Sequence, residues 1–390
     1  KYIRKLITSL PTDAMRALEI KDGVLTKCKD GSTAITIPSG VTEIGFAAFK
    51  NCEKLEKINF GSELKTIRNE AFRGCKNLKE LHFGKQIKAV GDSVFRDCIN
   101  LERIVVENGE MEIGERAFEN CAGLNQIELP DTMAEIYGGV FNSCKSLESI
   151  KLPESLIVLG ESSFADCAKL KEIEIPEHVA KIDDMVFNGC TGLEKVTFKG
   201  DIQKFGKNAF KDCMSLKSIF IPASVNFMGT SPFRGCKNLS EIIADPRSKN
   251  YKTVGNVLFN KSKSKLICFP ACSDYTEYSV PDSVTDINDW AFCECSNLNS
   301  IVIPDSVYEI GEGAFYNCSG LKEIVIPESV SRIDDIAFRG CASLTKLVIP
   351  DSVVELGWGI LNGCDNVTVI CSDNSVAAMY CEKKNIKHHK

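Results

Sequence analysis

The stretch Leu321–Cys341, LKEIVIPESVSRIDDIAFRGC, decides the fold of this 390-residue chain. The stretch that follows it, up to Cys364, has leucine, isoleucine and valine at the same offsets. Equivalent residues lie 23 positions apart. Self-similarity at a fixed period of about 20 to 50 residues is the mark of repeat architectures. We therefore interpret the chain as a stack of repeated units.

Cysteine marks the period most clearly. A cysteine recurs at every 23rd position in nine successive units, and the column resumes later for four more, which gives 13 copies. Phenylalanine stands three residues before every column cysteine except Cys364, where Leu361 replaces it. The column consists of Cys52, Cys75, Cys98, Cys121, Cys144, Cys167, Cys190, Cys213, Cys236, Cys295, Cys318, Cys341 and Cys364.

Each unit contains an alternating Ile-x-Ile segment, which predicts a short strand. Proline often follows and favours a turn. A second apolar pair leads to a corner position rich in glycine, where we expect left-handed backbone. The closing Ala-Phe-x-x-Cys is too short for a free helix, so we expect one helical or 3₁₀ turn. Glycine fills the corner at Gly45, Gly91, Gly114, Gly160, Gly206, Gly229, Gly311 and Gly357.

No single unit can bury its own apolar residues, so the units must stack and share one core. Over about residues 34 to 370 the pattern resembles the BspA-type leucine-rich repeat of bacterial surface antigens. The resemblance implies a right-handed leucine-rich-repeat solenoid. Short parallel β-strands would form its concave side, with short strands and 3₁₀ or helical turns on the other side. It also implies a surface protein that binds host or bacterial partners.

Breaks in the period divide the chain into segments. The column cysteine after Cys236 comes 59 positions later, so we place 36 extra residues there, with a hairpin tipped by Lys261 to Lys265. Another hairpin is predicted at Asp22-Gly23, and a helix capped by Ser375 near the end. The last four residues are expected to fray. The predicted segments are 1–33, a helical lead and hairpin cap; 34–236, nine repeats; 237–277, the insert; 278–364, four repeats; and 365–390, a strand-helix cap.

Composition narrows the choice of partner. The net charge is −6 and the pI about 5.5, whereas nucleic-acid binding proteins need a basic face. No apolar run reaches the roughly 18 residues of a membrane span. No signal peptide is visible in the chain, which begins with Lys1, so export stays open. We predict no nucleic-acid partner and no membrane span.

The 19 cysteines allow several interpretations. Column cysteines lie too far apart in sequence for a zinc motif, and we interpret them as small buried hydrophobic residues. In an exported protein, Cys268 with Cys272, and Cys371 with Cys381, could each close a local disulfide. Six cysteines fall outside the predicted column: Cys28, Cys268, Cys272, Cys293, Cys371 and Cys381.

Enzymatic chemistry has no support in the sequence. Only four histidines occur, two of them at the end of the chain. No nucleophile elbow, phosphate-binding loop, zinc-protease motif or dinucleotide fingerprint is present. We therefore predict no enzyme, no catalytic residue, no metal site and no cofactor.

The residue between the two isoleucines of each strand should point outward, because its neighbours point into the core. This column is mostly polar in its first seven positions and apolar in its last five. One interpretation is that the apolar residues simply suit a strand. The alternative is that they form a stripe that binds a protein partner or a second copy of the chain. These candidate binding residues are Phe220, Ile243, Val302, Val325 and Val348.

The sequence thus favours a non-enzymatic, adhesin-like solenoid at a bacterial cell surface or secreted from it. Its partner would be a host or bacterial surface protein, bound through the concave face or the hairpin insert. A cytoplasmic protein-interaction scaffold is the alternative, because buried thiols suit a reducing compartment equally well. A glycan-binding surface protein ranks last, because the exposed column contains one aromatic residue, Phe220.

Overall fold

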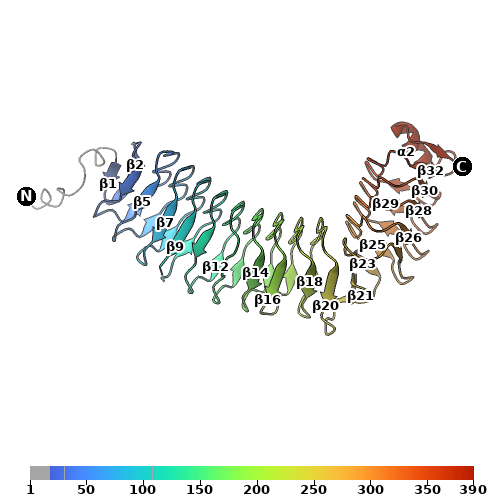
Figure 1. The fold of residues 1–390 in the computed structure, drawn as a ribbon, viewed down its shortest axis with the longest axis horizontal. Coiled ribbons are helices and arrows are strands. Elements are labelled where there is room, and N and C mark those ends of the chain that lie inside the picture. The colour runs from blue at the N-terminus through green and yellow to red at the C-terminus, as the bar shows by residue number, and fades with distance from the viewer. Residues whose placement is uncertain (1–17, 30, 108) are drawn as a thin grey trace, which may run out of the picture. The chain divides into compact units, whose positions relative to one another are not determined.

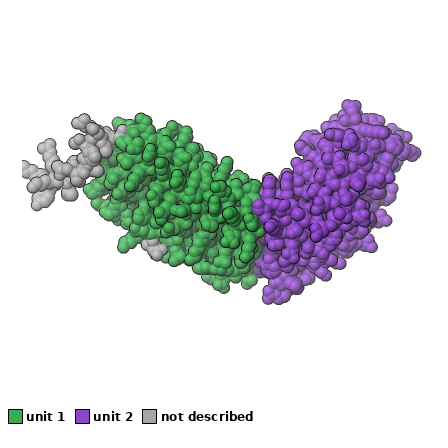
Figure 2. Space-filling view, viewed as in Figure 1, with its two compact units in different colours: residues 1–202 green, residues 203–390 purple. Residues whose placement is uncertain are grey.

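The computed structural model describes residues 18–29, 31–107 and 109–390, so the helical lead predicted over residues 1–17 lies outside the described residues. The chain forms two compact units, which we call unit 1 (residues up to 202) and unit 2 (residues 203–390) (Figure 2). Within each unit the chain winds into successive turns, or rungs, of a parallel β-solenoid (Figure 1). The division into five segments stays a prediction.

Most rungs contribute a strand of three or four residues from the Ile-x-Ile segment, as predicted, and these strands pair in parallel; the segment at residues 150–152 forms no strand. Paired residues in most rungs are separated by one period of the repeat, as in the pairing of Arg103 with Gln126. We call the outward side of these sheets the long-strand face. In unit 1 the strands are β3 (Ala34–Thr36), β5 (Lys57–Asn59), β7 (Glu80–Phe83), β9 (Arg103–Val106), β11 (Gln126–Glu128), β14 (Glu172–Ile175) and β16 (Lys195–Phe198). In unit 2 they are β18 (Ser218–Ile221), β20 (Glu241–Ala244), β24 (Glu277–Ser279), β26 (Ser300–Val302), β28 (Glu323–Val325), β30 (Lys346–Val348), β32 (Thr368–Ile370) and β33 (His388–His389).

A second set of strands, mostly of two residues, forms from the second apolar pair of each rung. In unit 1 these are β4 (Glu43–Ile44), β6 (Thr66–Ile67), β8 (Ala89–Val90), β10 (Glu112–Ile113), β12 (Glu135–Ile136), β13 (Val158–Leu159) and β15 (Lys181–Ile182). In unit 2 they are β17 (Lys204–Phe205), β19 (Phe227–Met228), β23 (Lys265–Cys268), β25 (Asp286–Ile287), β27 (Glu309–Ile310), β29 (Arg332–Ile333) and β31 (Glu355–Leu356). Two strand layers therefore enclose the core of each unit.

The core is a continuous stack of equivalent side chains. Phe118, Phe141 and Phe164 are fully buried, and their ring centroids are 5.9 and 5.4 Å apart in successive pairs. In unit 2, Phe315 stacks in the same way on Phe292 and on Phe338, at 5.0 and 5.4 Å. Each ring is therefore packed by the rungs on both sides, as the repeat period predicts.

The Ala-Phe-x-x-Cys segments form linked turns, and no continuous helix runs through them. Cys52 N–H donates to the Phe49 carbonyl, as in a 3₁₀ turn, but Phe49 N–H donates to Ala71 in the next rung. Ala47 and Asn51 have positive φ values of 53° and 61°. Left-handed residues interrupt a helix, so alternate amide groups become free to bond the next rung.

The corner glycines owe their place to close packing, and the left-handed backbone predicted for them is wrong. Gly160 and Gly357 are not among the residues with positive φ. A Cβ atom at Gly160 would lie 2.7 Å from the Gly138 nitrogen, and one at Gly357 would lie 2.2 Å from the Asp335 nitrogen. The left-handed position comes two residues later, where Ser162 has a φ of 56° and Gly359 a φ of 65°. Glycine is preferred because the neighbouring rung's backbone leaves no room for a side chain.

The cysteine column has a fourteenth position, which the sequence count assigned to the insert. Cys272 lies one full period before Cys295, and Phe269 stands three residues before it. Phe269 packs on Phe292 at 4.9 Å and donates its N–H to Ala291, as its equivalents do. The strand that follows, β24, pairs with β26 at the spacing of a regular rung. Among the described residues, the inserted segment therefore lies between Cys236 and Cys272, an interval longer than one period but shorter than two.

Hairpins occur where the period is broken. Strands β1 (Leu18–Lys21) and β2 (Val24–Cys28) pair around the predicted turn at Asp22-Gly23, where both residues have positive φ. In the long rung, β21 (Tyr251–Val254) and β22 (Val257–Asn260) pair around Gly255-Asn256 with the same feature. Strand β22 then pairs antiparallel with β23, so the insert contains two hairpins. The predicted lysine-rich tip is the second turn.

The C-terminal segment adds a helix and an edge strand. Helix α2 (Val376–Lys384) begins where the Ser375 hydroxyl accepts a hydrogen bond from Ala378 N–H, as predicted. The end of the chain is paired, so the expectation of fraying is wrong: β33 adds to β32, and Cys371 N–H donates to His389. Strand β32 would otherwise leave its outer backbone groups without strand partners.

Candidate interaction surface

The five candidate residues lie on the long-strand face of unit 2, on β18, β20, β26, β28 and β30, each between the two apolar residues of its Ile-x-Ile segment. Their core-facing neighbours, such as Ile219 and Ile324, are about 1% exposed. By contrast Phe220 is 42%, Val302 59% and Val325 56% exposed. Ile243 is also exposed, and Val348 is half-buried. Strand alternation therefore directs all five outward, as expected.

The structure divides the candidate residues into two groups. Phe220 is paired with Ile243 in the two-stranded sheet β18–β20. Val302, Val325 and Val348 belong to a separate six-stranded sheet, in which Val325 is paired with Val348. The rung between the groups has Ser279 in the middle position. The apolar surface is therefore not one continuous stripe.

A fourth residue, Ile370, extends the second group, and the sequence analysis missed it. It is half-buried and is paired with Val348 across β30 and β32. The last rung is one residue shorter before this strand, so counting one period from Val348 leads to the buried Cys371. The alternation in Thr368–Ile370 was the signal that could have revealed it. We call Val302, Val325, Val348 and Ile370 the apolar column.

Polar residues run beside the apolar column, at the first position of the same strands. Glu323 and Lys346 are neighbours in this second row, with the Lys346 ammonium 3.6 Å from the Glu323 carboxylate. Their side chains are 61% and 47% exposed, so water screens the pair and it adds little to stability. Ser300 and Thr368 occupy the two ends of the row.

The long-strand face of unit 1 is charged instead. Arg103 lies between Glu80 and Glu128, at 3.9 and 3.5 Å. Lys199 binds Glu174 and Glu154 at 2.7 and 2.9 Å, and these hydrogen bonds raise its pKa. Such pairs satisfy one another across the rungs, so this face offers little apolar area to a partner.

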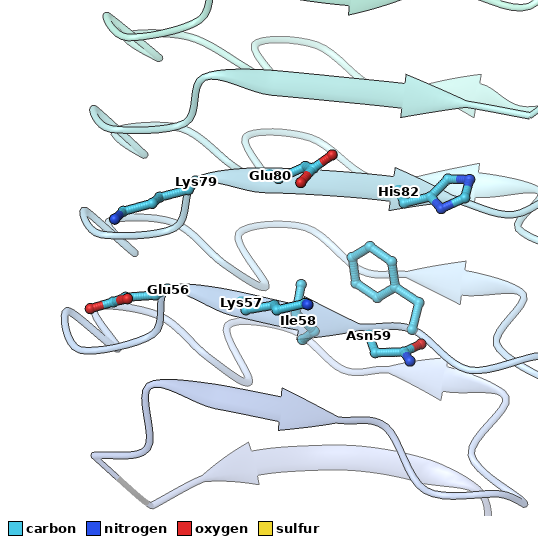
Figure 3. Close-up of a pocket in the computed structure, with 8 residues that line it drawn as sticks. Glu56, Lys57, Ile58, Asn59, Lys79, Glu80 and His82 are labelled. Atoms are coloured by element: carbon cyan, nitrogen blue, oxygen red, sulfur yellow. The ribbon is translucent and has the colours of Figure 1, made fainter.

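A shallow hollow of about 500 Å³ lies over β5 and β7 on that face (Figure 3). Figure 3 shows Lys57 and Asn59 on one strand, with Glu80 and His82 on the next. His82 lies 3.1 Å from Glu107. Most of the lining side chains are polar or charged, which matches a hydrated surface, and the chemistry of this group does not single out a ligand.

Comparison with known proteins identifies the repeat. The profile of the BspA type Leucine rich repeat region matches residues 18–148, 134–266 and 262–381. The chain belongs to the BspA-type leucine-rich repeat family. No curated protein matches it.

Two solved structures of leucine-rich repeat proteins are similar in fold to this chain. A leucine rich cell surface protein from Faecalibacterium prausnitzii A2-165 has a TM-score of 0.63 and 24% identity, with 92% of each chain covered. A leucine-rich repeat protein from Bacteroides ovatus ATCC 8483 has a TM-score of 0.55 and 28% identity, with 94% of this chain and 86% of that chain covered. Repeat solenoids of this kind usually act as binding scaffolds.

The column cysteines of this BspA-type chain have a specific bonding role. The Cys75 thiol donates to the Phe49 carbonyl of the preceding rung at 3.1 Å. Burial raises the pKa of Cys75 to about 12, so this thiol is a poor nucleophile. The same bond, to a carbonyl 26 residues earlier, recurs at Cys98, Cys121, Cys144, Cys167, Cys190, Cys236, Cys318, Cys341 and Cys364.

All 19 cysteines lie within the described residues, and none of them forms a disulfide. The two disulfides that the sequence left open, between Cys268 and Cys272 and between Cys371 and Cys381, are therefore not formed in this structure. Cys272 differs from the rest of the column because it is exposed. Across the residues described, no three His, Cys, Asp or Glu side chains are grouped to hold a metal ion.

The insert of the BspA-type chain is anchored by aromatic side chains. Tyr275 and Tyr278 occupy positions that are leucine and isoleucine in most rungs, and they pack on Phe269 at 5.7 and 4.9 Å. A Cβ atom at Gly255 would lie 2.5 Å from the Tyr275 hydroxyl oxygen, so the hairpin turn packs closely against the end of this side chain. Larger side chains fill the space beside the added hairpin.

In the part of the chain that the structure describes, no helix is long and apolar enough to cross a bilayer.

Proposed function

We propose that this chain is a non-enzymatic, adhesin-like protein that binds a protein partner and is displayed at or secreted from a bacterial cell surface. The apolar column on the long-strand face of unit 2 carries the proposal. Val302 and Val325 are more than half exposed there, and both belong to strands of one six-stranded sheet, which holds them in place. A contiguous exposed apolar patch on a rigid sheet is typical of protein interaction sites.

The column fits a protein better than it fits a glycan. Apolar side chains of similar size in neighbouring rungs form a smooth surface, with charged residues at its edge. This is the pattern of a protein interface with an apolar centre and a polar rim. The hollow in unit 1 is lined mostly by charged and polar side chains and has no comparable row of exposed apolar residues.

A binding screen with a matched control tests the proposal. The wild-type chain, the double variant Val302→Lys/Val325→Lys and the control Val105→Lys would be immobilised and exposed to purified extracellular-matrix and cell-surface proteins. Val105 occupies the same strand position in unit 1. We expect the wild type and the control to bind a shared partner, and the double variant to bind it at least tenfold more weakly. Equal binding by all three chains would refute the proposed site.

A cytoplasmic interaction scaffold is the second candidate, and it is favoured because buried thiols without disulfides suit a reducing compartment. The two candidates differ in location, so protease treatment of intact cells of the source bacterium separates them. A displayed protein is cleaved while the cells remain sealed, and a secreted one is found in the medium. A protein found only inside intact cells, and protected there, would support the scaffold.

A further inference from the structure

The long-strand face of unit 2 contains two parallel rows that are complementary to themselves when their order is reversed. One row is the apolar column, and the other lies beside it on the same four strands. In order, the apolar row is Val302, Val325, Val348 and Ile370, and the polar row is Ser300, Glu323, Lys346 and Thr368.

Reversal of the rung order exchanges the two ends of each row. It places Val325 opposite Val348, and Glu323 opposite Lys346. The end residues of the polar row, Ser300 and Thr368, are both uncharged hydroxyl residues. The reversed face therefore matches the original, with apolar residues against apolar ones and one charge against the opposite charge.

We propose that the apolar column docks a second copy of this chain, face to face, around a two-fold axis parallel to the strands. The inference rests on the proposed function, because it names the partner of the same surface. A two-fold axis in this direction reverses the rung order and keeps each row opposite itself. The contact is isologous, as in most homodimers.

The direction of the axis follows from charge. An axis along the stack of rungs would keep the rung order and, with the valines still facing each other, would place the two polar rows on opposite sides of the apolar column. No contact between Glu323 and the partner's Lys346 would then form. The axis parallel to the strands gives two Glu323–Lys346 contacts instead, one on each side of the axis and both on the same side of the valines.

The size of the face limits the strength of the dimer. Four strands about 4.8 Å apart, each about three residues long, give a contact of roughly 20 by 10 Å. A stable interface needs about 800 Å² on each partner. We therefore expect a weak, reversible dimer, which would be favoured where many copies are displayed close together.

Sedimentation velocity on the whole chain, from about 10 µM to about 1 mM, tests the inference. The wild type and the control Val105→Lys should sediment faster as concentration rises. Val302→Lys/Val325→Lys should stay monomeric. Each single reversal, Glu323→Lys or Lys346→Glu, should weaken self-association at least fivefold, because its two charge contacts become repulsive.

An equimolar mixture of the two single reversals provides the sharpest arm. In a mixed pair, both charge contacts join opposite charges again, so the mixture should associate about as well as the wild type. Circular dichroism would check that each variant is folded, since the exchanged groups are exposed. A mixture no stronger than either variant alone would overturn the proposed register.

A wild-type chain that remains monomeric at about 1 mM would overturn the dimer itself. If the double lysine variant has meanwhile lost a partner in the binding screen, the column binds a different protein, and the proposed function stands without self-association. If the chain dimerises as described but no partner emerges from the screen, the second copy is the partner that this surface binds.

Discussion

Replacement of one stacked phenylalanine tests whether the rungs share a continuous core. Phe141 is fully buried in unit 1, with the rings of Phe118 and Phe164 at 5.9 and 5.4 Å on its two sides. Phe141→Ala would leave a cavity between two rungs that cannot close without disturbing the strand pairing on both faces. The damage should therefore extend to the neighbouring rungs.

The expected cost is about 3–5 kcal/mol, the range for truncation of a buried phenylalanine. Loss of two ring contacts places Phe141→Ala in the upper half of that range. Phe46→Ala is the matched control, because Phe46 is 66% exposed and lies in the same unit. A surface truncation of this kind should change the free energy of unfolding by less than about 0.5 kcal/mol.

Urea denaturation followed by circular dichroism measures both variants, and amide hydrogen exchange locates the damage. We expect Phe141→Ala to lose protection at the amides of the rungs that contain Phe118 and Phe164, because nearest-neighbour contacts stabilise a solenoid. A cost below about 1 kcal/mol, or loss of protection confined to the mutated rung, would refute the idea of a shared core.

Three further predictions follow from particular contacts. Gly160→Ala should destabilise unit 1 by about 1–3 kcal/mol in urea denaturation, because the new Cβ would meet the Gly138 nitrogen at 2.7 Å; an unchanged midpoint would show that the rungs can separate. In native protein a thiol reagent should modify the exposed Cys272 much faster than the buried Cys167, because burial raises the pKa of Cys167. The fast phase of modification should disappear in Cys272→Ala. A fast phase that survives this substitution would contradict the assignment of Cys272 as the exposed thiol. The Arg247 guanidinium lowers the pKa of Asp245 from 3.8 to about 2, so this pair should stabilise the fold above about pH 4 and lose that effect as the pH falls to 2. In urea denaturation, Asp245→Asn should therefore unfold at a lower urea concentration than the wild type at pH 7 but not at pH 2. An equal difference at both pH values would argue against a contribution from the pair.

The charge and apolar patterns of the outward column were visible in the sequence, because strand alternation fixes which residues face outward. What the sequence could not provide was their grouping. Ser279 and the insert separate Phe220 and Ile243 from Val302, and a one-residue deletion brings Ile370 beside Val348. Both effects depend on which strands pair. In a rung of irregular length, the residue count alone does not fix the register of that pairing.

The sequence by itself determined the repeat, the strand in each rung and the buried phenylalanine column, since a constant period leaves equivalent residues directly above one another. The tertiary structure established that Cys272 belongs to the column; its spacing and Phe269 were present in the sequence, but Tyr275 and Tyr278 replace the residues that otherwise mark a rung. The structure also explained why glycine fills the corners, because the backbone of a neighbouring rung occupies the space that a side chain would need. The distance between two rungs arises only when the repeats are stacked, so the sequence of one repeat cannot show it.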